Sequence, residues 1–234
     1  MRMFCLCLAL SVVSPGMAQT FNITTSSTEK ELAMLQAVGE EAFGRLGHEL
    51  RVLSVPAERS LLMADSGQSD GDGLRVMGLE ARYPHLLAVP ESIMDTEFSA
   101  VVRNPAIQRI DGWEGLKPYR VGLIRGWKIV EQNTRGATSV YAAADYHSLF
   151  SMLAHDRIDV AVYTRPDVRG ILETMQLAQL RLLEPPLDTR PMVLYLHRSH
   201  EALVPELDRA LKAMKRDGRW QAIRASVLGA DAAQ

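Results

Sequence analysis

The chain has 234 residues, which allows one large domain or two lobes of about 100 residues each. Apolar residues make up 47% and charged residues 23%, and this ordinary balance excludes disordered, collagen-like and disulfide-dense chains. The 26 Lys and Arg residues are offset by 28 Asp and Glu residues, giving a formal net charge of -2 without a basic stripe, so nucleic acid is not expected as a partner.

The first 18 residues have the three-part pattern of a secretory signal peptide. Arg2 precedes an apolar run over residues 3–13, and small residues follow where a signal peptidase would cut, after Ala18. The run is too short to span a bilayer, and both cysteines, Cys5 and Cys7, lie within it. We therefore expect residues 1–18 to be removed and the mature protein to be soluble in the bacterial periplasm, without disulfides.

The first part of the mature chain alternates strand and helix patterns. Apolar residues at a spacing of two predict strands, and apolar residues at helical spacing predict helices, at these positions: strand 21–25, helix 29–46, strand 48–55, helix 56–65, and strands 74–79 and 86–93. The first helix has the clearest start, because Thr28 and Glu31 form a capping box. Residues 65–73, rich in Gly, Asp and Ser, are predicted to form a solvated turn.

The pattern restarts near Phe98. It predicts strand 98–102, a tight connection at 113–116, strand 119–124, helix 126–134, strand 139–142, helix 145–155, strand 159–163, helix 166–177, strand 192–196 and helix 201–215. Pro185 and Pro186 forbid regular pairing within residues 183–187, which are predicted to cross between two lobes. Such alternation favours an α/β fold with parallel strands covered by helices.

Five segments resemble a known family in their order and spacing: Gly67-Gln68-Ser69-Asp70-Gly71 before a strand, Trp113-Glu114-Gly115-Leu116, Val121-Gly122-Leu123-Ile124-Arg125-Gly126, residues 149–153 with 156–162, and residues 214–218 with 220–223. Together with the export signal, they resemble the family 3 extracellular solute-binding proteins, the periplasmic type that serves amino-acid ABC transporters. The resemblance implies a two-lobed, type II periplasmic binding protein-like fold, each lobe a mixed sheet flanked by helices. Lobe 1 would comprise residues 19–97 plus 188–234, and lobe 2, inserted, residues 98–187, with closure on a solute between them.

In such a fold the ligand lies beyond the carboxyl ends of strands. In the family an Arg holds the ligand carboxylate, and either Arg75 or Arg82 could be its counterpart here. Trp127 stands where the family has a Thr, and Thr164 stands where the family has an ammonium-binding Asp. An anionic or aromatic-stacking solute is therefore at least as plausible as an α-amino acid. Arg75 or Arg125 would donate hydrogen bonds to such a solute, and the ring of Trp127 would form a flat wall of the site. The predicted ligand-binding residues are Ser26, Asp70, Arg75, Arg82, Arg125, Gly126, Trp127, Tyr163 and Thr164.

Three other motifs favour different chemistry less strongly. Ser69 lies in a G-x-S-x-G match, but the predicted order is helix then strand, the reverse of a nucleophile elbow. The Asp-rich turn lacks the Glu that a calcium loop requires. His197 and His200 have a spacing found in metal sites, but no third ligand is identified.

The sequence therefore predicts a monomeric, non-enzymatic protein that captures a small polar or charged solute, amino-acid-like or an organic acid, with no catalytic residue, metal or cofactor. Its expected partner is an ABC permease or a membrane sensor. An enzyme of the dehydratase type on the same scaffold is the alternative, with Glu29 or Asp70 as the general acid.

Overall fold

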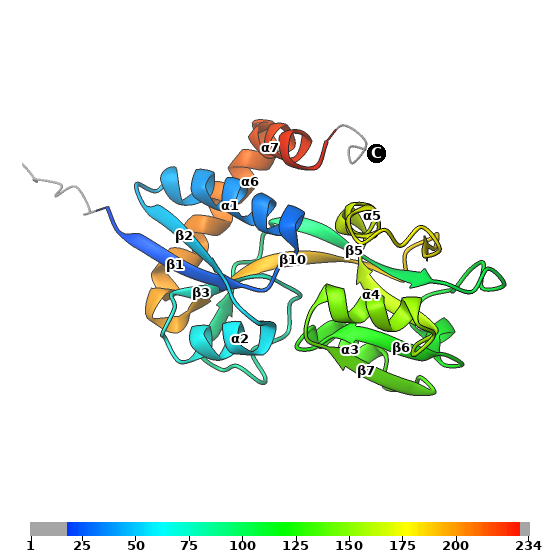
Figure 1. The fold of residues 1–234 in the computed structure, drawn as a ribbon. Coiled ribbons are helices and arrows are strands. Elements are labelled where there is room, and N and C mark those ends of the chain that lie inside the picture. The colour runs from blue at the N-terminus through cyan, green and yellow to red at the C-terminus, as the bar shows by residue number, and fades with distance from the viewer. Residues whose placement is uncertain (1–17, 230–234) are drawn as a thin grey trace, which may run out of the picture.

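Two β-sheets joined by two long strands organise the chain in the computed structural model, which describes residues 18–229 (Figure 1). The overall strand order is β2-β1-β3-β10-β5-β8-β6-β7, with β4 beside β10 and β9 beside β5. Apart from Ala18, the predicted signal peptide lies outside the described residues. No helix within the described residues is long and apolar enough to cross a membrane.

The first sheet combines strands from both ends of the chain. It contains β1 (Thr20–Thr25), β2 (Glu49–Ser54), β3 (Gly71–Arg75), β4 (Leu86–Ala88) and the second half of β10 (Asp188–His197). β1 pairs in parallel with β2 and β3, and β10 runs antiparallel to β3 and β4. β1, β2 and β3 therefore end at the same edge of the sheet.

The second sheet is built from the middle of the chain. It contains β5 (Met94–Val102), β6 (Arg120–Ile124), β7 (Ser139–Ala143), β8 (Val160–Thr164), β9 (Arg181–Leu182) and the first half of β10. β6 pairs in parallel with β7 and β8, whereas β5 is antiparallel to β8, β9 and β10. The carboxyl ends of β6, β7 and β8 share one edge.

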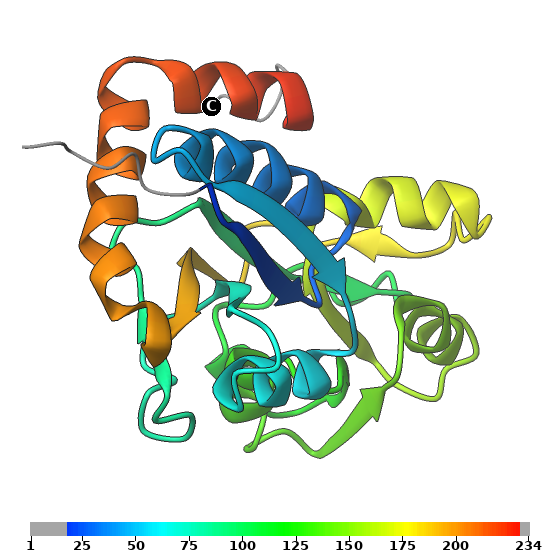
Figure 2. The same cartoon turned by 90° about the vertical axis from the view of Figure 1, so that its left-hand side faces the viewer.

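Helices cover both faces of each sheet (Figures 1 and 2). Their bounds are α1 (Glu29–Gly44), α2 (Ala57–Asp65), α3 (Lys128–Asn133), α4 (Tyr146–Ala154), α5 (Arg165–Thr174), α6 (Val204–Arg216) and α7 (Arg219–Leu228), with 3-10 turns at Glu114–Leu116 and Arg198–Leu203. α1, α6 and α7 pack on one face of the first sheet and α2 on the other. On the second sheet α4 and α5 share a face, opposite α3.

The alternation of side chains along β10 shows how these layers form. Leu194 and Leu196 belong to the core beneath α1 and α6, while Val193 and Tyr195 belong to the core beneath α2. Because successive side chains on a strand point to opposite faces, one apolar run supplies both layers. The fold class is therefore α/β with two mixed sheets flanked by helices, as predicted.

The crossing between the sheets lies on β5 and β10. Residues 188–192 of β10 pair antiparallel with residues 98–94 of β5, and β10 then continues to pair with β3. The predicted crossing at residues 183–187 is wrong, because this segment runs beside β5: Leu183 N donates to Ala100 O at 2.8 Å, and Leu187 N to Phe98 O at 2.7 Å. The predicted lobe boundaries at 97/98 and 187/188 stay a prediction.

β3 begins three residues earlier than its apolar pattern predicts. The predicted solvated turn at 65–73 is wrong at its end, because Gly71, Asp72 and Gly73 belong to the strand and are buried. Gly71 lies so close to β10 that a Cβ atom there would be 2.1 Å from the backbone oxygen of Tyr195. Glycine, usually a turn former, is needed here for close approach of two backbones.

We predict that Gly71→Ala destabilises the protein by about 3 kcal/mol, since the β3–β10 pair would have to separate. Chemical denaturation at equilibrium measures the free energy of unfolding. The control is Gly44→Ala at the end of α1, where nothing lies within 4 Å of an added Cβ and the higher helix propensity of Ala should stabilise by up to about 1 kcal/mol. Equal stability of the two variants would contradict the prediction.

Candidate functional site

A cleft lies between the two sheets, at the carboxyl ends of their parallel strands. It has two parts, which share the lining residues Ser26, Ser27 and Trp127. The first, of about 40 Å³, lies beside the crossing strands and is called the inner pocket; the second, of about 550 Å³, is called the outer cavity. Ligand sites of small molecules usually have volumes of a few hundred Å³, so the outer cavity has the size of one.

The outer cavity follows from the strand topology. Residues at or directly after the ends of β1 and β2 line it from the first sheet: Ser26–Glu29 and Ser54–Glu58. Residues at or after the ends of β6, β7 and β8 line it from the second: Ile124, Arg125, Trp127, Ala144–Tyr146, Tyr163, Asp167 and Ile171. Because parallel strands end at one edge, the chain turns meet there.

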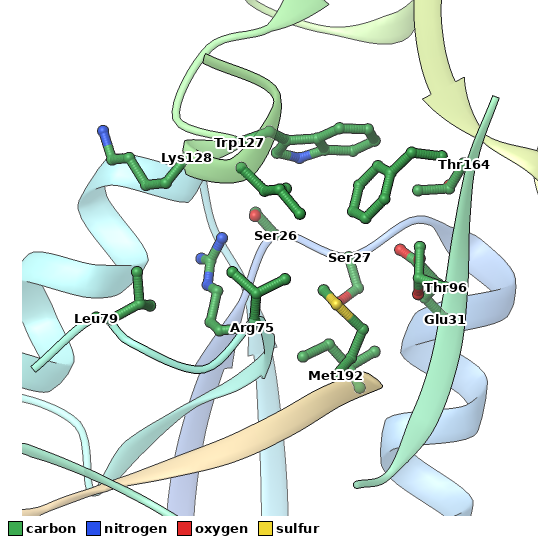
Figure 3. A pocket seen from close by; sticks show the side chains of 14 residues that line it. Ser26, Ser27, Glu31, Arg75, Leu79, Thr96, Trp127, Lys128, Thr164 and Met192 are labelled. Carbon is green, nitrogen blue, oxygen red and sulfur yellow. The ribbon is translucent and has the colours of Figure 1, made fainter. Parts of the chain in front are cut away.

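The inner pocket is mainly apolar, with a few polar groups from both sheets. Figure 3 shows Trp127 and Lys128 reaching it from the second sheet, with Arg75 and Met192 on the opposite side. Thr96 and Thr164 line it from β5 and β8. The Oγ1 atom of Thr164 is buried and has no hydrogen-bond partner among residues 18–229.

Trp127 is at the centre of the cleft. It lies directly before α3, lines both the pocket and the cavity, and packs against Tyr163 with ring centroids 5.1 Å apart. Tyr163 is buried at the end of β8 and lines the outer cavity. The predicted positions Ser26, Arg125, Trp127 and Tyr163 thus meet in the outer cavity, and Arg125 is exposed there.

Arg75 lines the inner pocket but is engaged by the protein itself. Its Nε donates to Asp72 Oδ1 at 2.6 Å, and its Nη2 donates to the backbone oxygen of Ala57 at 3.3 Å. Asp72 is fully buried and also accepts a hydrogen bond from Ser60. Burial raises the pKa of Asp72, while the ion pair with Arg75 and the Ser60 hydroxyl act in the opposite direction. Arg75 therefore neutralises a buried carboxylate of its own strand.

Three predicted site residues line neither the pocket nor the cavity: Arg82, Gly126 and Asp70. Arg82 is exposed and lies 3.7 Å from Glu58. Gly126 is buried, and a Cβ atom there would be 2.7 Å from the Cβ of Ala57, so its role is to let the second sheet approach α2. Its φ of 87° is also one that glycine adopts without strain.

Asp70 was predicted to bind the ligand, but the structure places it away from the cleft. It precedes β3 and therefore lies at the opposite end of the strand from the cleft. Its Oδ2 accepts from the backbone nitrogen of Asn22 at 2.7 Å, and its Oδ1 lies 2.8 Å from His200 Nε2. Asp70 joins chain segments and cannot serve as a general acid in the cleft. His200 is thus a partner of Asp70, and within residues 18–229 no group of three metal-ligating side chains is found.

Two carboxylates near the cleft were missed by sequence reasoning. Glu31 is buried in the inner pocket: Thr28 N donates to its Oε2 at 3.2 Å, and Thr96 Oγ1 donates to its Oε1 at 2.9 Å. Its capping role was foreseen, but its contact with β5 depends on the crossing strands. Burial raises the pKa of Glu31, and these hydrogen bonds oppose the rise.

Asp167, the second missed carboxylate, lies in the first turn of α5 and lines the outer cavity. Its Oδ1 accepts from the backbone nitrogen of Lys30, in α1, at 3.2 Å. The only signal in the sequence was its position three residues after Thr164, one helical turn beyond the place where the resemblance predicts an ammonium-binding Asp.

Side-chain contacts also connect the two halves across the cleft. Lys128 of α3 forms an ion pair with Glu58 of α2, and it lies 3.2 Å from Glu131 on its own helix. The Lys30–Asp167 hydrogen bond makes a second connection, between α1 and α5. The two halves are therefore in direct contact at two places beside the outer cavity, at Glu58 and at Asp167.

Solved structures of the same fold include proteins that are distant from this chain in sequence. A substrate-binding protein of an amino-acid ABC transporter matches with a TM-score of 0.68 and 14% identity, over 88% of this chain and 98% of that one. An ancestral arginine-binding protein bound to glutamine gives 0.70 and 16%, over 91% and 99%. A histidine kinase sensor domain similar to periplasmic binding proteins gives 0.71 and 16%, over 90% and 96%.

The chain therefore has the two-lobed fold of the type II periplasmic binding proteins, and its structural neighbours include substrate-binding proteins of amino-acid ABC transporters. No protein-family profile matches the sequence. A protein of Shewanella oneidensis described as uncharacterized is 27% identical over 187 residues, which are 77% of this chain and 70% of that protein. At these identities the likeness to solved structures concerns the fold.

We predict that Arg75→Ala destabilises the protein by about 3–5 kcal/mol, because it leaves Asp72 buried without its counter-charge. The matched control is Arg82→Ala, which removes an exposed guanidinium and should change the free energy of unfolding by less than about 1 kcal/mol. Urea denaturation of both variants measures the difference. A similar small loss in both would show that the Arg75–Asp72 pair is not needed for folding.

We also predict that Glu31→Gln raises the melting temperature at pH 7.5 but not at pH 4. The folded-state pKa of Glu31 is raised, so the wild-type protein loses stability as pH rises through that pKa and a buried charge forms. A glutamine carries no charge at any pH. Below the unfolded-state pKa the wild-type side chain is protonated in both the folded and the unfolded state. The variant is then no more stable than the wild-type protein.

The control for this pH series is Glu29→Gln, an exposed acid in the same first turn of α1. It reports what loss of a negative charge does at that helix end, about 0.3–1 kcal/mol. A pH-independent difference between Glu31→Gln and Glu29→Gln would refute the burial effect.

Proposed function

We propose that this protein binds a small polar or charged solute in the cleft between its two lobes. One observation carries the proposal: the outer cavity, about 550 Å³, is lined by turns from both sheets. A solute in that cavity would contact both lobes at once. Because only a ligand that binds the closed arrangement more tightly can favour it, contacts from both sides provide the means of closure.

The lobes would comprise residues 19–97 with 188–234, and residues 98–187. β5 and β10 would then form the hinge between them. The Lys128–Glu58 pair and the close approach of Gly126 to Ala57 would be contacts of the closed form.

The solute would be delivered from the periplasm to a membrane partner. An ABC permease fits the structural neighbour that serves an amino-acid transporter, and a membrane sensor fits the neighbour that is a histidine kinase sensor domain. We propose a monomer without catalytic activity. The enzyme alternative is weakened because Asp70, one of its two acid candidates, lies away from the cleft.

The test is thermal denaturation of the purified protein with a panel of amino acids, organic acids, aromatic acids and polyamines. A ligand at 100 times its dissociation constant should stabilise the folded state by about 2.7 kcal/mol, which shifts the melting temperature by several degrees. If no compound of the panel shifts it, the solute-binding proposal fails.

Closure is tested with any compound that binds. Gly126→Ala should weaken binding, because the added Cβ would collide with Ala57 and hold the lobes apart. Gly218→Ala has a similar positive φ but open space around it, so it controls for backbone strain alone. If the two variants bind equally well, the Gly126 contact is not part of closure.

A further inference from the structure

We propose that Asp167 binds a cationic group of the solute, a guanidinium or a primary ammonium, in the outer cavity. This inference rests on the proposed solute-binding function and specifies the class of solute. It departs from the sequence expectation, in which arginines on the cleft made an anionic solute plausible.

The carboxylate of Asp167 is only half satisfied by the protein. One oxygen, Oδ1, accepts the hydrogen bond from Lys30 N. The other, Oδ2, is buried and has no partner among residues 18–229, and the residue, which is 8% exposed, lines the outer cavity. A buried carboxylate oxygen without a donor is costly, and a donor supplied by a ligand in the cavity would remove that cost.

The other charged groups of the cavity favour the same sign of ligand. Its lining carries the carboxylates of Glu29, Glu58, Asp145 and Asp167, against the single guanidinium of Arg125. A concave surface with excess negative charge concentrates cations.

Two of these carboxylates already have partners within the protein. Glu58 pairs with Lys128, and Asp145 accepts from Ser148 N at 2.7 Å as the cap of α4. Arg125 is exposed and donates from Nη2 to the backbone oxygen of Ala142 at 3.3 Å, and within residues 18–229 no ion pair between Arg125 and Asp167 is found. Asp167 is thus the lining carboxylate that combines burial with a free oxygen.

Aromatic rings provide a wall suited to a cation. Trp127 and Tyr163 pack against each other, and both line the cavity that Asp167 lines. Burial raises the pKa of Tyr163, and the negative charges of Asp167 and Glu31 raise it further. Its hydroxyl therefore stays neutral, and a cation beside Asp167 would lie near aromatic rings, which attract positive charge.

The experiment compares compounds of similar shape that differ by one positive charge. The pairs are L-arginine with L-citrulline, L-lysine with L-norleucine, and agmatine with N-carbamoylputrescine, each titrated into the purified protein by calorimetry; the second compound of each pair keeps one ammonium group and lacks the other cationic group. We expect the first compound of at least one pair to bind about tenfold more tightly, or better, than the second. We expect Asp167→Asn to abolish that preference.

The matched control is Asp145→Asn. It lines the same cavity and loses the same charge, but asparagine keeps the helix cap, so it should reduce the preference by much less than Asp167→Asn does. A second readout needs no ligand: Asp167→Asn should raise the melting temperature of the free protein, because it removes an unpaired buried charge, whereas Asp145→Asn should not.

The outcomes separate the two proposals. If an anionic or neutral solute binds and Asp167→Asn leaves its affinity unchanged, solute binding stands and the cation site is wrong. If Asp167→Asn weakens no cation more than Asp145→Asn does, or lowers the melting temperature of the free protein, the special role of Asp167 is wrong. If no compound of the pairs or of the broader panel binds, the proposed function itself fails.

Discussion

The antiparallel pairing of β5 with β10 is the constraint on which the cleft depends. Residues 94–98 and 188–192 pair within the second sheet, and β10 continues directly into the first. Because two paired strands connect the sheets, the sheets are held side by side with the carboxyl ends of their parallel strands facing a common space. Glu31 on α1 and Thr96 on β5 form a hydrogen bond at this junction, so the first helix is fixed to the crossing strand.

The cleft concentrates buried charge, which a stable fold normally avoids. Asp72 and Arg75 compensate each other, and Glu31 has hydrogen-bond donors for both oxygens. Asp167 is different, because one of its oxygens has no donor among the described residues. A group left unsatisfied in a cavity of ligand size is more informative about function than the satisfied charges beside it.

The sequence indicated which turns line the cleft better than it indicated which charged side chains there are already paired within the protein. Ser26, Trp127 and Tyr163 line the outer cavity, a position that follows from strand ends and helix starts that local periodicity indicates, and their contact with a ligand stays a prediction. Arg75 was expected to face a ligand, but its partner Asp72 is hidden in a segment that composition assigned to a solvated turn. Asp70 was misplaced because it precedes β3 and so lies at the amino end of that strand, away from the cleft, and Arg82 because it lies exposed in the loop after β3, near Glu58.

Local patterns were enough for the α/β class, the order of helices and strands and the turns that meet at the cleft, because these depend on residues near one another in the chain. Contacts between distant segments decided the rest. Asp167 receives its hydrogen bond from Lys30, Glu31 from Thr96, and Glu58 forms its ion pair with Lys128, all across long sequence separations. Which carboxylates are satisfied, and which one remains free, follows only from how the two sheets are brought together.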